Sequence, residues 1–190
     1  MNDSLSSSNL RVLITADEIE DAVHRLGAEV SERFSGRPLT IVGVLTGAVI
    51  FVADLIRSVR IPHRIGFVQA SSYRGEATAP GALRIDEALL PDIAGRDVLL
   101  VDDIFDTGRT LERLVTALKR HGPARIVSAV LLWKEGRQEV HIEPDYFCFR
   151  IPNRFVVGYG LDYDDDYRHL PFVAELPAVG GEASESEGSR

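Results

Sequence analysis

Three aspartates stand beside a turn rich in hydroxyl groups near the middle of the sequence. Asp102 and Asp103 follow the apolar run 98–101, and Asp106 comes shortly after them. The turn that follows combines two hydroxyl side chains, a glycine and an arginine: Thr107, Gly108, Arg109 and Thr110. The glycine allows a tight bend and the approach of a ligand without a Cβ in the way. The amides of this turn would point outward at the start of a helix, where the helix dipole favours a phosphate.

The acid pair needs a different part of the same ligand. Carboxylates repel phosphate, so Asp102 and Asp103 must face hydroxyl donors or a divalent cation. A ribose 5-phosphate meets both demands, with its phosphate in the turn and its diol on the acid pair. Asp106 lies between these two groups, within reach of chemistry at C1 of the sugar.

Other kinds of protein also end an apolar strand with paired acids. A nucleotide hydrolase uses such a strand to hold Mg²⁺, but it needs a G-x-x-x-x-G-K-[ST] loop as well, and this sequence has none. A phospho-receiver signalling domain places its acid pair near its start, which would leave the first half of this chain unexplained. An ordinary polar loop is the third alternative, and the strand-turn-helix context disfavours it.

The central stretch resembles the signature of the type I phosphoribosyltransferases: VLLVDDIFDTGRTL, residues 98–111. Three flanking segments are similar to the hypoxanthine-guanine branch and follow its order: VLTGAVIFVADL (44–55), ASSYRGE (70–76) and NRFVVGYGLDYDDDYRHLP (153–171). The resemblance covers residues 11 to 176. It implies an α/β fold, with an open, mostly parallel twisted sheet flanked by helices and a small hood region.

The activity implied by this resemblance is a step of purine salvage. The 5-phosphoribosyl group of 5-phospho-α-D-ribose 1-diphosphate would pass to N9 of hypoxanthine or guanine, giving IMP or GMP and pyrophosphate. Some relatives keep the signature but regulate transcription by sensing the sugar diphosphate. A regulator of that kind would need a basic patch for nucleic acid, and no cluster of Lys and Arg is visible here.

The pyrophosphate and the metal are assigned through the resemblance. A short turn after the run 39–45 matches the backbone that binds pyrophosphate: Leu45, Thr46 and Gly47. Many relatives carry a lysine where this chain has Thr46, so the amides would do more of the work. Arg168 matches a pyrophosphate-binding arginine, and the neighbouring acids 164–166 are interpreted as surface. The cofactor implied is Mg²⁺, with acidic ligands: Asp102, Asp103 and Asp162.

The purine half of the site also follows from the resemblance. On position alone, Lys134 is either a solvated surface charge or a donor that faces the ligand. It matches the lysine that donates to the oxygen at C6 of the purine, which would accept 6-oxopurines and reject adenine. The ring of Phe155 would stack on the purine and the backbone of Val156 would read its edge. Asp106 would act as general base toward N7.

A polar stretch, 71–81, matches the mobile lid of the family through Ser72 and Tyr73. Such a lid would keep water from the reacting sugar carbon. Tyr73 could equally be a surface aromatic.

The elements that must position these residues alternate between strand and helix. Apolar runs predict strands at 39–45, 65–70, 83–88, 98–101, 126–132 and 146–150, and helical spacing predicts helices at 16–34, 48–58 and 111–121. One domain is expected from 11 to 176. The polar ends, 1–10 and 177–190, are expected to be disordered.

Composition narrows the choice of partners. A net charge of −8 argues against general binding of nucleic acid. No apolar run approaches the roughly 20 residues that span a bilayer, and the N-terminus lacks the features of a signal peptide, so a cytoplasmic location and no membrane contact are expected. The single cysteine, Cys148, excludes an intrachain disulfide. The resemblance implies a homodimer or homotetramer.

Overall fold

The structure is a computed structural model that describes residues 10–72 and 83–176. Six strands form its main sheet: β2 (Leu39–Leu45), β3 (His63–Ser72), β4 (Leu83–Asp86), β5 (Asp97–Phe105), β6 (Arg125–Lys134) and β7 (Tyr146–Ile151). Their order across the sheet is β4-β3-β2-β5-β6-β7, and only the pair β3 and β4 is antiparallel. The predicted open, mostly parallel sheet is confirmed.

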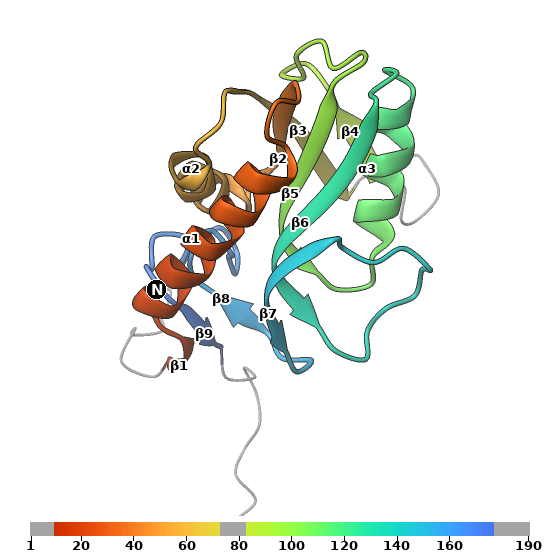
Figure 1. Cartoon of the computed structure of the whole chain (residues 1–190). Helices are drawn as coiled ribbons and strands as arrows, with labels where there is room; N and C mark the ends of the chain where they lie inside the picture. Colours follow the sequence, from red (N-terminus) through yellow and green to blue (C-terminus); the bar gives the residue numbers. More distant parts are fainter. Residues whose placement is uncertain (1–9, 73–82, 177–190) are drawn as a thin grey trace, which may run out of the picture.

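Helices cover both faces of this sheet. The helices α1 (Ala16–Arg33) and α2 (Val49–Ser58) lie on one face, and α3 (Arg109–Lys119) lies on the other (Figure 1). Among the described residues, no helix combines the length and the hydropathy that crossing a bilayer requires.

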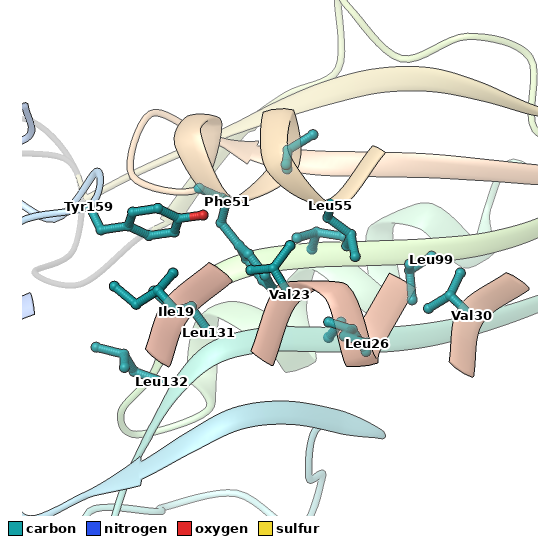
Figure 2. Packing of buried hydrophobic residues seen from close by; sticks show 14 of the residues in the cluster. Ile19, Val23, Leu26, Val30, Phe51, Leu55, Leu99, Leu131, Leu132 and Tyr159 are labelled. Atoms are coloured by element: carbon teal, nitrogen blue, oxygen red, sulfur yellow. The ribbon is translucent and has the colours of Figure 1, made fainter. Parts of the chain in front are cut away.

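The central strand β5 is buried on both faces and joins two cores. Leu99 and Val101 pack in the core beneath α1 and α2, whereas Val98 and Leu100 pack beneath α3. Figure 2 shows Leu99 in the first of these cores. A strand held on both sides in this way is a rigid platform for whatever its carboxyl end carries.

The predicted strand at 98–101 is too short. In the structure β5 continues to Phe105, so Asp102 and Asp103 lie inside the strand and not after it. Parallel pairing with β6 continues as far as Phe105 opposite Trp133, and this pairing outweighs the low strand propensity of aspartate. The following helix begins at Arg109, two residues earlier than predicted.

A second, smaller sheet, with the segment 153–155 that leads into it, forms the small hood region that the resemblance implied. It joins the two ends of the described chain, in the order β1 (Arg11–Ile14), β9 (Val173–Glu175) and β8 (Val156–Val157), and both pairings are antiparallel. An ion pair between Arg154 and Glu175, at 2.5 Å, ties β9 to the segment before β8. This small sheet lies below the carboxyl end of the main sheet in the view of Figure 1.

Candidate active site

A cavity of about 330 Å³ opens where β2, β5 and the turn before α3 meet. It collects most of the side chains predicted to bind the sugar, its phosphate and the pyrophosphate: Leu45, Thr46, Gly47, Asp102, Asp103, Asp106, Thr107, Gly108, Thr110, Asp162 and Arg168. Apart from the lid, four predicted residues do not line it: Arg109, Lys134, Phe155 and Val156. The carboxyl ends of parallel strands are where open α/β sheets bind ligands.

The phosphate turn has the expected backbone. Gly108 is the N-cap of α3 with a left-handed φ of 82° and no side-chain cap. Within the described part of the chain, the amides of Thr107, Gly108 and Thr110 have no hydrogen-bond acceptor. Free amides at the N-terminus of a helix form an anion site.

The tight bend predicted at Gly108 is present, but the close neighbour of this glycine is the protein itself. A Cβ there would lie 2.4 Å from a methyl group of Val140 and 2.8 Å from the ring of Phe105. The missing Cβ therefore makes room for the protein, and the left-handed φ adds a second requirement for glycine.

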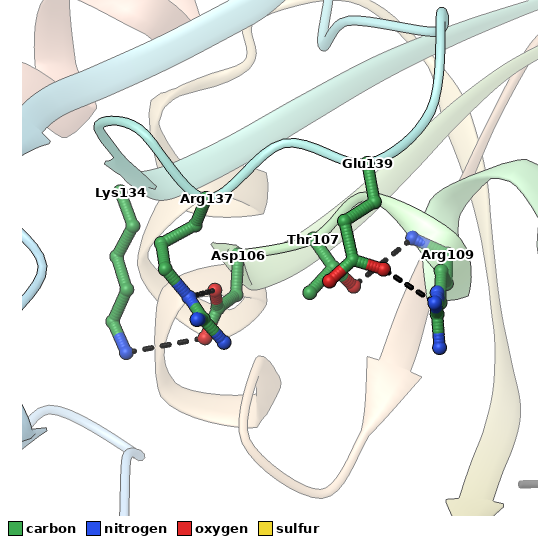
Figure 3. A network of polar contacts seen from close by, with 6 residues as sticks. All are labelled: Asp106, Thr107, Arg109, Lys134, Arg137 and Glu139. Carbon is green, nitrogen blue, oxygen red and sulfur yellow. Dashed lines mark hydrogen bonds and ion pairs between the residues drawn. The ribbon is translucent and has the colours of Figure 1, made fainter.

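Arg109 turns away from the cavity. Its side chain is 68% exposed and forms an ion pair with Glu139 at 2.5 Å (Figure 3). The amide of Glu139 donates to the carbonyl of Thr107, at 2.9 Å. The arginine side chain thus fastens the segment after β6 over the phosphate turn and does not line the cavity. The predicted contact of Arg109 with the phosphate or ribose stays a prediction.

The acid pair lines the cavity, with Asp102 buried and Asp103 half-buried. Asp102 is only 8% exposed, and the amide of Asp103 donates to its carboxylate at 3.0 Å. Burial raises the pKa of Asp102 well above its usual range, and the charge of Asp103 raises it further. Burial also raises the pKa of Asp103, whereas its hydrogen bond with Asp102 and, to a smaller extent, the charge of Arg168 lower it. Two neighbouring acids with raised pKa values favour a ligand that brings hydroxyl donors or positive charge.

A glycine at position 47 is required by this acid pair. A Cβ on Gly47 would lie 1.8 Å from a carboxylate oxygen of Asp103. The pyrophosphate turn and the acid pair are therefore in direct contact, and the Leu45–Thr46 peptide bond in this turn is cis. Thr46 is exposed.

Arg168 and Asp162 line the same cavity as the pyrophosphate turn. A guanidinium nitrogen of Arg168 is 2.9 Å from Asp162 and 3.1 Å from Asp165. Asp165 was interpreted as surface, and it is exposed, but it also helps to orient this arginine.

Asp106 is held by two cations at the edge of the cavity. Its carboxylate is 3.3 Å from the ammonium of Lys134 and 2.9 Å from Nε of Arg137 (Figure 3). The side chain of Lys134 is only 12% exposed, which disfavours the alternative of a solvated surface charge.

Phe155 and Val156 lie in the hood. Phe155 is 52% exposed, so it is not a core residue, and its ring meets Tyr163 edge to face with centroids 5.6 Å apart. Val156 is buried in β8. An exposed aromatic ring of this kind can stack on a flat ligand.

Comparison with known proteins identifies the family of this chain. A model of the phosphoribosyl transferase domain matches residues 14–164. The hypoxanthine-guanine phosphoribosyltransferase of Streptococcus pneumoniae R6 is 42% identical over 166 residues, which are 87% of this chain and 92% of the relative. The chain belongs to the hypoxanthine-guanine phosphoribosyltransferase family.

Two further relatives agree with this family membership. The hypoxanthine phosphoribosyltransferase of Salmonella typhimurium LT2 is 40% identical over 88% of this chain and 95% of its own length. A crystal structure of a hypoxanthine phosphoribosyltransferase from Staphylococcus aureus superposes with a TM-score of 0.84 at 36% identity, covering 93% of this chain and 96% of that one.

The residues present suit the magnesium that this phosphoribosyltransferase family implies. Asp102, Asp103 and Asp162 offer hard oxygen ligands around one cavity. Among the described residues, no three acidic, histidine or cysteine side chains are close enough to hold a metal by themselves. Mg²⁺ usually keeps several waters and shares one or two carboxylates with substrate phosphates, so this arrangement fits it.

Two parts of the site differ from the rest: the structure does not describe Tyr73 of the predicted lid, and the sequence did not predict Arg137. Tyr73 lies outside the described residues, and Ser72 is described only as the last residue of β3, so the lid stays a prediction. Arg137 was not predicted, although it contacts Asp106. Its place three residues after Lys134, in the loop that follows a strand, was the only available signal.

Proposed function

We propose that this protein transfers the 5-phosphoribosyl group from 5-phospho-α-D-ribose 1-diphosphate to N9 of hypoxanthine or guanine. The products are IMP or GMP and pyrophosphate. The observation that carries this proposal is the shared cavity, because it joins a phosphate turn, an acid pair and a pyrophosphate turn around the space for one sugar. The names of the relatives support the same activity.

The pairing of Asp106 with Lys134 supports the choice of a 6-oxopurine. In such a base the oxygen at C6 and the N–H at N7 lie side by side on one edge. An ammonium donor and a carboxylate acceptor 3.3 Å apart can meet both groups once the base separates them. Adenine presents an amino donor at C6, which would face the ammonium of Lys134.

Asp106 serves as general base in this proposal. It takes the proton from N7, so that negative charge builds at N9 as N9 attacks C1 of the sugar. The same carboxylate stabilises the positive charge that develops on the sugar as pyrophosphate leaves. Arg168 and the amides of the turn at Thr46 and Gly47 stabilise the leaving group.

The acid pair and Asp162 would hold the magnesium ion. Bound there, Mg²⁺ supplies charge neutralisation to the sugar diphosphate. The free amides of Thr107, Gly108 and Thr110 hold the 5-phosphate, and the phosphate anchors the sugar for attack at C1.

The test is a base-selectivity assay on the full chain. Purified protein is given Mg²⁺ and the sugar diphosphate with hypoxanthine, guanine, xanthine or adenine in separate reactions, and nucleotide and pyrophosphate are measured. We expect IMP and GMP and no AMP. Formation of AMP alone, or binding of the sugar diphosphate with no turnover of any base, would refute the proposal.

The surroundings of the enzyme are part of the same proposal. Its partners are small molecules, a 6-oxopurine and the sugar diphosphate, and it acts in the cytoplasm as a homodimer or homotetramer. Sedimentation of the purified chain tests the assembly, and a monomer at all concentrations would contradict it.

A further inference from the structure

We infer that Tyr159 and Asp54 are positioning residues for the pyrophosphate half of the site. The hydroxyl of Tyr159 donates to the carboxylate of Asp54 at 2.5 Å, between segments that are far apart in the sequence. This inference rests on the proposed function, because it assigns the pair an effect on pyrophosphate and not on the purine.

The pyrophosphate half is made by two segments that meet at a close backbone contact. One is the turn at Thr46 and Gly47, and the other is the segment 158–168, which carries Asp162 and Arg168. A Cβ on Gly160 would lie 2.1 Å from the carbonyl oxygen of Gly47. The two backbones therefore touch, and any shift of one segment changes the distance between the turn and Arg168.

Arg168 takes its position from this same contact. One of its guanidinium nitrogens donates to the carbonyl of Gly160 at 2.8 Å, and the amide of Gly160 donates back to the carbonyl of Arg168 at 3.0 Å. The hydrogen bonds to Gly160 therefore fix the position of the guanidinium, and the contact with Gly47 fixes the position of Gly160. What holds Gly160 in place decides where the cation stands.

Tyr159 precedes Gly160 and fixes it from the other side. It is 6% exposed and has a left-handed φ of 50°, a conformation that is rare for a bulky residue and that signals a specific requirement. Its ring reaches into the core near Ile19 and Phe51, with the hydroxyl beside α2 (Figure 2). Burial raises the pKa of this hydroxyl, and the bond to Asp54 raises it further, so it stays a donor.

Asp54 connects the hydroxyl of Tyr159 to the helix that follows the pyrophosphate turn. It lies on α2, the helix that begins directly after that turn, and it is held by an ion pair with Arg57. A helix is a rigid element, so a bond to Asp54 sets the segment 158–168 against α2 and against the turn at its start. Neither Tyr159 nor Asp54 lines the cavity of the candidate site. Both line a second cavity, of about 510 Å³, beside α1 and α2, so we assign them a positioning role and no ligand contact.

The experiment compares Tyr159→Phe with wild type and with Tyr146→Phe in the full chain. Tyr146, on β7, is the matched control. Its hydroxyl accepts a hydrogen bond from Arg33 at 3.1 Å and does not contact the site. We measure KM for the sugar diphosphate, KM for hypoxanthine, and binding of magnesium pyrophosphate and of IMP by calorimetry.

For Tyr159→Phe we expect KM for the sugar diphosphate and the dissociation constant of pyrophosphate to rise about tenfold, the factor for one hydrogen bond to a charged group. KM for hypoxanthine and the IMP dissociation constant should stay within about twofold. Tyr146→Phe should change none of these values. A lower melting temperature with unchanged pyrophosphate binding, or an equal loss for pyrophosphate and IMP, would overturn the inference.

A second variant keeps the inference falsifiable if Tyr159→Phe folds poorly. Asp54→Asn retains an acceptor oxygen but removes its charge, so we expect a smaller rise in the pyrophosphate dissociation constant. Adding Tyr159→Phe to it should give no more than the effect of Tyr159→Phe alone, because one bond is lost. Additive effects would refute the pairing. Since calorimetry needs no turnover, these outcomes are separate from failure of the proposed reaction, which the base assay reports.

Discussion

The two halves of this site are built in different ways. The sugar-phosphate half comes from one continuous stretch, the end of β5, the turn 107–110 and the start of α3. The pyrophosphate and purine half is assembled from separate segments: the turn after β2, the end of β6, the hood and the segment 158–168. The first half takes its ligand-facing groups from one local stretch of backbone, whereas the second is brought together by contacts such as that of Gly160 with Gly47.

The junction of the two halves should give the largest effect. Asp106 belongs to the continuous stretch by sequence but contacts Lys134 and Arg137 from the other half. We expect Asp106→Asn to lower kcat by about 10² to 10⁴, the range for loss of a general base, in steady-state assays with hypoxanthine. The urea midpoint and IMP binding serve as controls for folding. Wild-type kcat in this variant would remove Asp106 from the chemistry.

Next in size is a change in the backbone of the continuous half. Gly108→Ala should lower the free energy of unfolding by about 2 to 5 kcal/mol, because a left-handed alanine costs about 1 to 2 and overpacking against Val140 adds about 1 to 3. Gly36 is the matched control, since its φ is 71° and a Cβ added there would meet nothing within 4 Å. Gly36→Ala should cost only about 1 to 2 kcal/mol. Equal losses in urea unfolding would show that Val140 moves aside freely.

The dispersed half is tested by Lys134→Ala. We expect KM for hypoxanthine to rise by about 10- to 100-fold, because a charge-assisted hydrogen bond to the base is lost. KM for the sugar diphosphate should change much less. Lys119→Ala, an exposed lysine in the last turn of α3, is the control. An unchanged KM for hypoxanthine would mean that Lys134 serves only to pair with Asp106.

A pH series examines the buried acids of the continuous half. Because the pKa of Asp102 is raised, the folded ligand-free chain keeps a proton that the unfolded chain releases. The free energy of unfolding should therefore fall as pH rises from about 4 through the raised pKa, and each pKa unit is worth about 1.4 kcal/mol. Asp102→Asn should flatten this fall in urea titrations, and Asp164→Asn, an exposed acid, should not. A parallel fall in all three proteins would show that other groups cause it.

The smallest effect is expected at Arg109. Its exposed pair with Glu139 should contribute about 0 to 1 kcal/mol, so Arg109→Ala should change KM for the sugar diphosphate by less than about threefold. Steady-state kinetics measure this directly. A rise in KM for the sugar diphosphate of about tenfold or more would show that the side chain of Arg109 binds the phosphate. The sugar-phosphate half would then depend on side chains as well as on backbone amides.

The difference between the halves also explains what the sequence could predict. The phosphate turn was predictable because all its parts are adjacent, and the structure gathers Asp102, Asp103, Thr107, Gly108 and Thr110 around one cavity. The length of β5 was not predictable from propensity, because pairing with β6 draws the acids into the strand.

Contacts between residues far apart in the sequence could not be predicted from residue spacing. The outward turn of Arg109 depends on Glu139, and the packing role of Gly108 depends on Val140, both in the loop after β6. Tyr159 and Asp54 stand 105 positions apart, so no local pattern could join them. For the purine and pyrophosphate residues, resemblance to the family did what periodicity could not.

The small sheet of β1, β9 and β8 has a consequence for biosynthesis. Its middle strand, β9, is made of Val173–Glu175, close to the end of the described chain. A ribosome making this protein completes the phosphate turn long before it supplies the strand that joins β1 to β8. The nascent chain can thus form the phosphate turn early, but the small sheet next to Phe155 cannot form before residues 173–175 have been made.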